Sequence, residues 1–220
     1  NKSGASGPAY TSIVGGGNNA CVLHYIENKD ILKDGDLVLI DAGCEYENYA
    51  ADITRTFPVN GKFSTQQAAI YDIVLEALEQ AIEVTQSGAP YNVTNETTIK
   101  VITEGLVNLG LLQGEVTDLI TSEAHREFYM HGAGHWLGMD VHDVGDYKID
   151  GEWRIYEPGM VVTIEPGIYI SEHNMRVEEK WRGIGVRIED DIMITKTGNK
   201  NLTSGVPKSR KAIEELMSKT

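Results

Sequence analysis

Cysteine, long apolar runs and basic charge are all scarce in this sequence. Its 220 residues contain only two cysteines, Cys21 and Cys44, which are too few for a disulfide framework and lack metal-ligand spacing. We therefore expect two buried, reduced thiols. The longest apolar runs, such as residues 37–40, fall far short of the roughly 20 residues that span a bilayer, and no charged-then-apolar signal segment opens the sequence. A cytoplasmic protein with no membrane partner is expected.

The shortage of basic residues bears on possible partners. The chain has 33 Asp and Glu residues against 19 Lys and Arg residues, which gives a formal net charge of −14. A chain repelled by phosphate is a poor candidate for binding nucleic-acid backbones, because such binding needs stripes of Lys and Arg. The composition, 41% hydrophobic and 24% charged, is that of a globular protein long enough to bury one substantial core.

Apolar patterns predict strands first and helices afterwards. A continuous apolar run over residues 36–40 predicts an interior strand, buried on both faces. Ser64 and Gln67 have the spacing of a capping box, and apolar residues at helical spacing follow until residues 88–90. Further strands are expected at 12–14 and 50–57, and further helices at 92–110 and 118–124.

The second half of the sequence repeats the order of the first. Residues 34–43 align without gaps on residues 158–167, and each segment has a turn glycine, an apolar strand, a carboxylate and a glycine. Such a duplication predicts an α+β fold in which the two halves share a mixed sheet about a pseudo-twofold axis, with helices packed on one side. No long linker separates the halves, so one domain over residues 1–220 is expected.

The repeat singles out four carboxylates as candidate ligands. A single carboxylate at the end of an apolar strand is often only a solvent-exposed turn residue. Here the same pattern occurs in both halves, so four carboxylates are expected near the pseudo-twofold axis. Buried anions without partners are unstable, so converging carboxylates must share a proton or gather cations. Oxygen-rich ligands with one imidazole suit Mn, Mg, Co or Zn. The four residues are Asp41, Asp52, Glu165 and Glu189.

Three histidines lie together in one glycine-rich segment and can supply the imidazole. His131, His135 and His142 are interspersed with glycines that disfavour a helix, so we expect an irregular segment or a strand lining a site. Gly132 directly follows His131, which excludes the helical HExxH zinc motif.

Six motifs that contain these residues occur in a fixed order. They are Leu39-Ile40-Asp41-Ala42-Gly43, Asp52-Ile53-Thr54-Arg55-Thr56, His131-Gly-Ala-Gly-His135, Val141-His142-Asp143, Ile164-Glu165-Pro166-Gly167 and Arg187-Ile188-Glu189-Asp190. Together they resemble the pita-bread metallopeptidases, and within that family the bacterial Xaa-Pro aminopeptidases, over nearly the whole chain. The resemblance implies a metal-dependent exopeptidase that releases the N-terminal residue from peptides with proline in the second position.

The resemblance also implies the ligands and their chemistry. Two divalent ions, usually Mn²⁺ in the family with Co²⁺ or Zn²⁺ as alternatives, would be bridged by Asp52 and Glu189. A hydroxide held between the ions would attack the scissile bond, and Glu165 would pass its proton to the leaving amine. The full ligand set would be Asp41, Asp52, His135, Glu165 and Glu189.

Four further residues resemble catalytic positions of the family. His24 and His142 would contact substrate and stabilise the tetrahedral intermediate, and His131 would shape the proline subsite. Arg187, two residues before Glu189, would orient a ligand carboxylate rather than touch substrate, with a surface arginine as the alternative.

Two other functions stay open at this point. A prolidase of the same fold would cut only Xaa-Pro dipeptides, and a non-catalytic module would only bind peptides. Because none of the five ligand types is lost, the binding module is the weaker alternative. Full-length members of the family carry a separate N-terminal domain that nothing here matches, and a homo-oligomer is compatible with the sequence.

Overall fold

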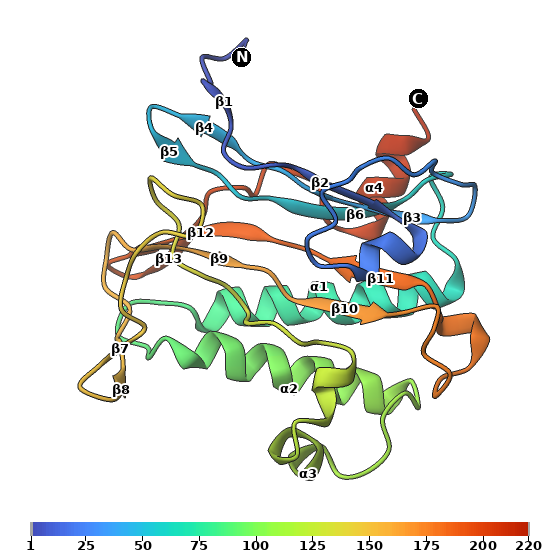
Figure 1. Cartoon of the computed structure of the whole chain (residues 1–220). Coiled ribbons are helices and arrows are strands. Elements are labelled where there is room, and N and C mark those ends of the chain that lie inside the picture. The colour runs from blue at the N-terminus through green and yellow to red at the C-terminus, as the bar shows by residue number, and fades with distance from the viewer. Residues whose placement is uncertain (1, 220) are drawn as a thin grey trace.

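The computed structural model describes residues 2–219, and its first half supplies a three-stranded sheet (Figure 1). β3 (Leu37–Asp41) lies between β2 (Ile13–Gly16) and β6 (Thr54–Pro58) and pairs with both. Leu37, Val38 and Leu39 are at most 2% exposed, which explains the apolar run and confirms the predicted interior strand. A smaller sheet contains β1 (Gly7–Pro8), β4 (Cys44–Tyr46) and β5 (Tyr49–Ala50).

The second half repeats this arrangement. β12 (Asp190–Thr195) lies between β9 (Val161–Ile164) and β13 (Gly198–Asn201). Asp41 pairs with Thr54 in the first half and Ile164 with Asp190 in the second, so corresponding strand ends meet in both halves. The remaining strands are β7 (Lys148–Ile149) with β8 (Glu152–Trp153), and β10 (Gly167–Ile170) with β11 (Ile184–Arg187).

The strand pairs differ in one respect from the expected mixed sheet. All of the pairs described within residues 2–219 are antiparallel. The two halves meet through both side chains and backbone. The Thr56 hydroxyl donates to the Arg187 carbonyl at 2.9 Å and accepts from the Arg187 amide at 3.2 Å, and the Glu189 amide donates to the Thr54 carbonyl at 3.1 Å.

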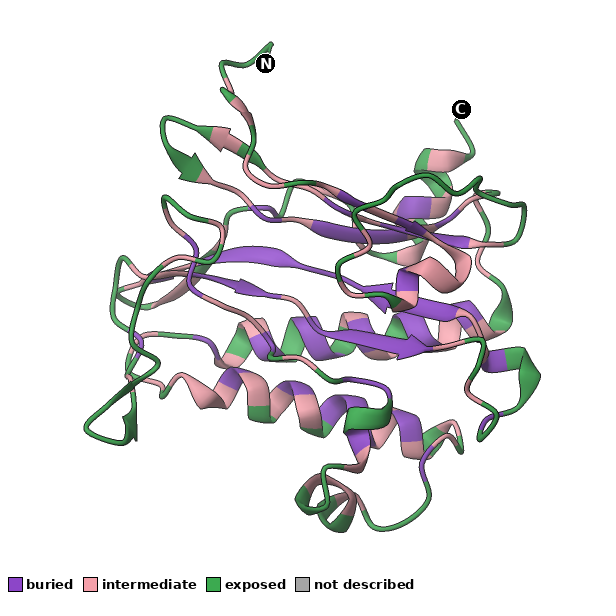
Figure 2. Ribbon diagram, in the orientation of Figure 1, coloured by how far each residue is buried: buried purple, intermediate pink, exposed green. Residues whose placement is uncertain are grey.

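Two long helices pack side by side along one side of the sheets (Figure 1). α1 (Thr65–Val84) begins with the predicted capping box, in which Ser64 and Gln67 exchange side-chain to backbone hydrogen bonds. α2 (Asn92–Asn108) follows, close to the predicted range. Figure 2 shows that both helices bury the stripe that faces the sheets. One core cluster joins α1 residues such as Val74 and Leu78 to Ile164, Ile188 and Ile192.

The third predicted helix is shorter than expected. α3 spans Val116–Thr121, and a separate 3₁₀ turn follows over Ala124–Glu127, whereas one helix was predicted over 118–124. Glu123 lies between them with a φ of 55°, a left-handed conformation that ends a helix. The chain closes with α4 (Arg210–Met217), which Ser209 caps. Two other 3₁₀ turns span Gly17–Cys21 and Glu179–Trp181.

Two compositional predictions can be compared with the structure. Both cysteines are free, as expected, but neither is buried: Cys21 is partly exposed, and Cys44 is exposed in β4. Among residues 2–219, none of the helices is both long and apolar enough to cross a bilayer.

Candidate metal centre

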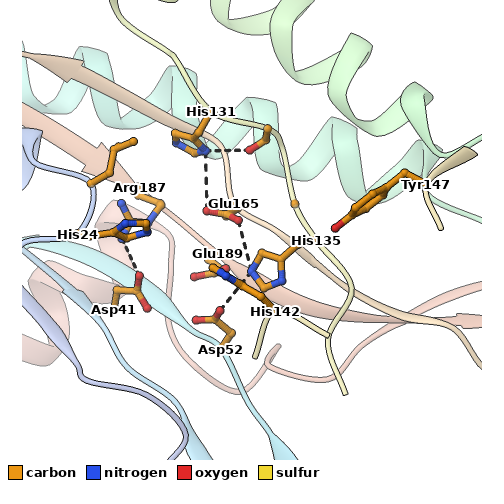
Figure 3. Close-up of a pocket in the computed structure, with 13 residues that line it drawn as sticks. His24, Asp41, Asp52, His131, His135, His142, Tyr147, Glu165, Arg187 and Glu189 are labelled. Atoms are coloured by element: carbon orange, nitrogen blue, oxygen red, sulfur yellow. Dashed lines mark hydrogen bonds and ion pairs between the residues drawn. The ribbon is translucent and has the colours of Figure 1, made fainter. Parts of the chain in front are cut away.

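The five predicted metal ligands come from separate segments and converge on one cavity of about 390 Å³ (Figure 3). Asp41 is the last residue of β3, and Glu165 directly follows β9, as the aligned segments predicted. Asp52 and Glu189 were expected on strand-like stretches, but they lie in irregular backbone just before β6 and just before β12. Both carboxylates nevertheless turn into the cavity, as does that of Asp41 from within the β3 ladder.

His135 turns its Nε2 toward the carboxylates. Its Nδ1 lies 2.9 Å from the carbonyl oxygen of Trp136, which can only accept, so Nδ1 donates to it. Although burial opposes it, the hydrogen bond to Asp52 and the charge of Glu165 raise the pKa of His135, so in the metal-free protein the carboxylates favour a proton on Nε2, whose place a cation would take. Nε2 lies 3.5 Å from Asp52 Oδ2 and 3.6 Å from Glu165 Oε1. Asp52, His135 and Glu189 each offer one ligand atom, and these atoms lie within 4.8 Å of one another.

The segment that carries His135 is irregular, as predicted, and lies directly against β9. The Thr163 amide donates to the His135 carbonyl at 2.9 Å, and the Glu165 amide donates to the Ala133 carbonyl at 2.8 Å. A Cβ on Gly134 would lie only 1.9 Å from the Thr163 carbonyl oxygen. Glycine is therefore required at this position for the histidine segment to approach the strand.

The carboxylates repel one another in the protein without a cation. Burial, reinforced by the charges of Glu165, Asp52 and Asp41, raises the pKa of Glu189 well above its ordinary value. Burial also raises the pKa of Glu165 to about 7, against the opposing effect of His135 and Arg187. A divalent cation would reverse this, because it favours the ionised form of every ligand.

Tyr10 is a member of the site that the sequence analysis missed. Its hydroxyl contacts both Asp41 and Asp52, and burial together with these two charges raises its pKa far above the usual range. Burial alone would raise the pKa of Asp52, but the hydrogen bonds from His135 and Tyr10 lower it instead. Tyr10 belongs to none of the motifs and directly follows the Gly-, Ser- and Ala-rich residues 1–9. Nothing in its sequence context therefore indicated a role in the site.

Arg187 begins a directed chain of hydrogen bonds across the cavity. Its Nη2 donates to Asp41 Oδ2 at 2.6 Å, and its Nη1 donates to the Tyr169 hydroxyl at 3.2 Å. The Tyr169 hydroxyl lies 2.8 Å from His131 Nε2, and His131 Nδ1 lies 2.8 Å from the Gly132 carbonyl. Because the carbonyl only accepts, His131 is the Nδ1–H tautomer and Tyr169 donates to it. Burial lowers the pKa of His131 to about 4, so its ring is neutral.

The remaining predicted residues line the same cavity. The rings of His142 and His135 lie 4.4 Å apart, centroid to centroid, and His24 lies on the opposite wall. Burial and the charge of His135 lower the pKa of His142. Tyr147, which no motif indicated, points its hydroxyl toward the site from the side of His135 (Figure 3). All of the sequence-predicted site residues are thus brought together in space.

The donor set fits divalent cations. Four carboxylates and one imidazole, whose Nε2 is turned toward them, face a common space, and hard oxygen donors with one nitrogen suit Mn²⁺, Co²⁺ or Zn²⁺. Further hydrogen-bond partners hold these ligands in place, as is usual for metal sites: Arg187 and Tyr10 donate to Asp41, and the Trp136 carbonyl accepts from His135.

Comparison with known proteins identifies the class first. The sequence model of metallopeptidase family M24 matches residues 1–196, and the chain belongs to this family. Among curated relatives, the Xaa-Pro aminopeptidase of Escherichia coli is 56% identical over 217 residues, which cover 99% of this chain and 49% of that protein. The Xaa-Pro aminopeptidase of Haemophilus influenzae is 59% identical over 210 residues, 96% of this chain and 48% of the relative.

Solved structures agree with these relatives. The aminopeptidase PepP of Pseudomonas aeruginosa matches with a TM-score of 0.98 and 60% identity, over 99% of this chain and 49% of that chain. The Escherichia coli aminopeptidase P with the inhibitor Pro-Leu matches with a TM-score of 0.95 and 56% identity, over 99% of this chain and 49% of that chain. The matches confirm the family resemblance and the α+β pita-bread fold. The chain spans about half the length of these relatives.

Proposed function

We propose that this chain is a metal-dependent Xaa-Pro aminopeptidase, which releases the N-terminal residue from peptides with proline in the second position. The observation that carries the proposal is the convergence of four carboxylates and His135 on one cavity, built from both halves of the chain. Relatives with 56% and 59% identity that bear this name support the same activity.

Two divalent ions, Mn²⁺ or otherwise Co²⁺ or Zn²⁺, would be held by Asp41, Asp52, His135, Glu165 and Glu189. Bound divalent ions act as Lewis acids on a carbonyl oxygen and lower the pKa of water. The Glu165 carboxylate accepts the proton of the attacking water and donates it to the proline nitrogen as the peptide bond breaks.

The histidines around the ligands act on the substrate. His24 and His142 lie on the cavity wall, where they would contact the peptide and donate to the developing oxyanion. His131 is neutral and held in one orientation by Tyr169, so it supplies a fixed surface for the proline ring. Arg187 would keep Asp41 in place rather than touch the peptide.

A paired peptide assay tests this function. Purified protein is freed of metal with EDTA, reloaded with MnCl₂ and given an Xaa-Pro-Yaa tripeptide or an Xaa-Pro dipeptide. Release of the first residue from the tripeptide, lost on chelation and restored by Mn²⁺, is the expected result. Cleavage of the dipeptide alone would instead indicate a prolidase, and binding without cleavage a non-catalytic module. The Pro-Leu complex of the Escherichia coli protein favours the aminopeptidase, because Pro-Leu is what remains when Xaa-Pro-Leu loses its first residue.

Three further properties complete the proposal. Residues 1–220 act as one catalytic domain, supported by the core cluster that joins both halves, and limited proteolysis should yield no stable half.

The protein works in the cytoplasm, where two free thiols are stable, and cell fractionation tests this. It forms a homo-oligomer through exposed apolar side chains such as Tyr49, Met139 and Val144, which sedimentation analysis measures.

A further inference from the structure

A buried arginine lies behind the metal cavity with all of its donors in use. Arg55 is only 7% exposed. Its Nη1 donates to the Glu189 carbonyl at 2.6 Å and to the Thr54 carbonyl at 2.9 Å. Its Nη2 donates to Asp190 Oδ1 at 2.7 Å and to the Val206 carbonyl at 3.0 Å, and its Nε donates to the Pro207 carbonyl at 3.2 Å. The guanidinium therefore joins β6, the start of β12 and the segment 206–207.

Asp190 is the anionic partner of Arg55, and it too is saturated. Its side chain is fully buried, and each carboxylate oxygen accepts from two donors. Oδ1 accepts from Arg55 and from the Thr203 hydroxyl at 2.8 Å. Oδ2 accepts from Asn201 at 2.7 Å and from the ammonium of Lys208. Three residues of the segment 201–208 thus bind this one carboxylate.

The same segment also holds the second bridging ligand. The Thr203 hydroxyl accepts from the Asp191 amide at 3.1 Å, and Asp191 Oδ2 accepts from the Asp52 amide at 3.2 Å. The backbone of Glu189 is fixed by Arg55, and the backbone of Asp52 is fixed by Asp191. Both ligands that lie in irregular backbone therefore depend on one network for their position.

We propose that Arg55 and Asp190 are positioning residues of the metal centre, which couple the placement of segment 201–208 to the backbone of Asp52 and Glu189 and so set the affinity for the metal. The inference rests on the metal centre of the proposed function. A role in stability alone would not need this pair, because apolar side chains of similar volume often replace a buried ion pair without loss of stability. Such side chains could not hold the Glu189 carbonyl.

Two conservative variants test the proposal in the full chain. Arg55→Lys keeps the positive charge but removes the planar fork that serves Glu189 and Asp190 together, and Asp190→Asn keeps the size but removes the negative charge. Mn²⁺ binding to the metal-free protein is measured by calorimetry, and the visible spectrum of the Co²⁺-loaded protein reports the ligand geometry. We expect Mn²⁺ affinity to fall at least about tenfold and the Co²⁺ spectrum to change, as for other residues that orient metal ligands.

The matched control is Arg210→Lys. Arg210 also ties the C-terminal region to the body of the protein, through two hydrogen bonds of 2.6 and 2.8 Å to Asp72, but it contacts no ligand segment. It should lower the unfolding temperature slightly and leave Mn²⁺ affinity and the Co²⁺ spectrum unchanged.

Wild-type Mn²⁺ affinity and an unchanged Co²⁺ spectrum in both Arg55→Lys and Asp190→Asn would overturn the inference. If these variants do not fold, Lys208→Gln removes only the more exposed of the two cations on Asp190, and it should weaken Mn²⁺ binding several-fold. Unchanged binding in that variant would then refute the proposal. Failure of the wild-type protein to bind Mn²⁺ would refute the metal centre itself, which is a separate outcome.

Discussion

The Thr54 hydroxyl donates a 2.6 Å hydrogen bond to Glu189 Oε2, across 135 residues of sequence. The same hydroxyl accepts from Arg187 Nε at 3.2 Å, and the Thr54 carbonyl accepts from the Glu189 amide at 3.1 Å. A threonine from the first half thus orients a candidate bridging ligand from the second. The cavity therefore depends on the contact between the two halves rather than on either half alone.

Removal of this hydroxyl should weaken the metal centre. Thr54→Val keeps the shape of the side chain but leaves Glu189 Oε2 and Arg187 Nε without this partner. We therefore expect the free energy of Mn²⁺ binding to weaken by about 1–2 kcal/mol, which is roughly tenfold in affinity. Calorimetric titration of the metal-free protein measures it. Thr103→Val is the control, since that buried hydroxyl only donates to Ile99 in its own helix. Equal Mn²⁺ affinities in the two variants would contradict the role of Thr54.

Asp52→Asn should remove both metal occupancy and hydrolysis. The amide keeps the size but loses the charge that a bridging position requires, so Mn²⁺ affinity should fall by more than about 100-fold, beyond the effect of an outer partner. Metal analysis after desalting and the Xaa-Pro-Yaa assay measure the two losses. Full activity of this variant in a chelating buffer would rule out the metal mechanism.

Gly134→Ala should displace the histidine segment. The added Cβ would lie 1.9 Å from the Thr163 carbonyl oxygen, so the segment must move away from β9 and carry His135 with it. We expect about 1–3 kcal/mol of lost stability from overpacking, together with weaker metal binding. Gly132→Ala is a matched control, because the nearest atom to its Cβ is 4.0 Å away. Urea unfolding of both variants measures the loss of stability, and Mn²⁺ titration measures the loss of metal affinity.

Tyr169→Phe should release His131 from its fixed orientation. The variant loses the donor to His131 Nε2 and the acceptor for Arg187 Nη1. A loss of about 1 kcal/mol in substrate binding corresponds to roughly fivefold in KM, with a smaller change in kcat. Nitrogen NMR of the His131 ring should show that Nε2 has lost its hydrogen bond, while the Gly132 carbonyl keeps the hydrogen on Nδ1. Tyr156→Phe loses a buried hydroxyl bonded to Thr94 and should leave KM unchanged.

The metal-free protein should lose stability as the pH rises from about 5 to 8. Burial raises the pKa of Glu165 from its ordinary 4.5 to about 7, so the folded state holds this proton more tightly than the unfolded state does. The contribution of Glu165 to the free energy of unfolding is fully present below pH 4.5 and is lost as the pH passes 7. At 1.36 kcal/mol per pKa unit, this contribution of Glu165 to the free energy of unfolding amounts to about 3 kcal/mol.

Urea unfolding in EDTA, for wild type and for Glu165→Gln, isolates this effect. The variant should lose less stability than wild type between pH 5 and 8. His131 has a pKa lowered to about 4 by burial and acts in the opposite direction, since its contribution is lost as the pH falls from 6.5 to 4. His131 is present in both proteins, so the difference between their profiles reports Glu165 together with its 3.9 Å contact to His131. Parallel pH profiles would show that Glu165 is not strongly perturbed.

Local pattern was enough to predict much of the fold. The capping box at Ser64 and Gln67 and the interior strand β3 depend on residues close together in sequence, and both were predicted correctly. The break in the third predicted helix at Glu123 was not predicted, because the left-handed conformation of a glutamate cannot be recognised from the amino-acid composition. The segments that hold Asp52 and Glu189 were assigned to strands because their apolar alternation does not show where pairing begins.

The sequence by itself determined the family, the fold class and the residue types of the donor set, because repeated strand ends and a glycine-rich histidine segment are local features. The tertiary structure alone decided which groups support those donors. Tyr10, Thr54 and Tyr169 meet their partners across 18 to 135 residues, and the links from Arg55 to the carbonyls of residues 206 and 207 span 151 and 152 residues. A hydrogen bond acts over about 3 Å of space, and distance along the chain does not limit it once packing brings the two groups together.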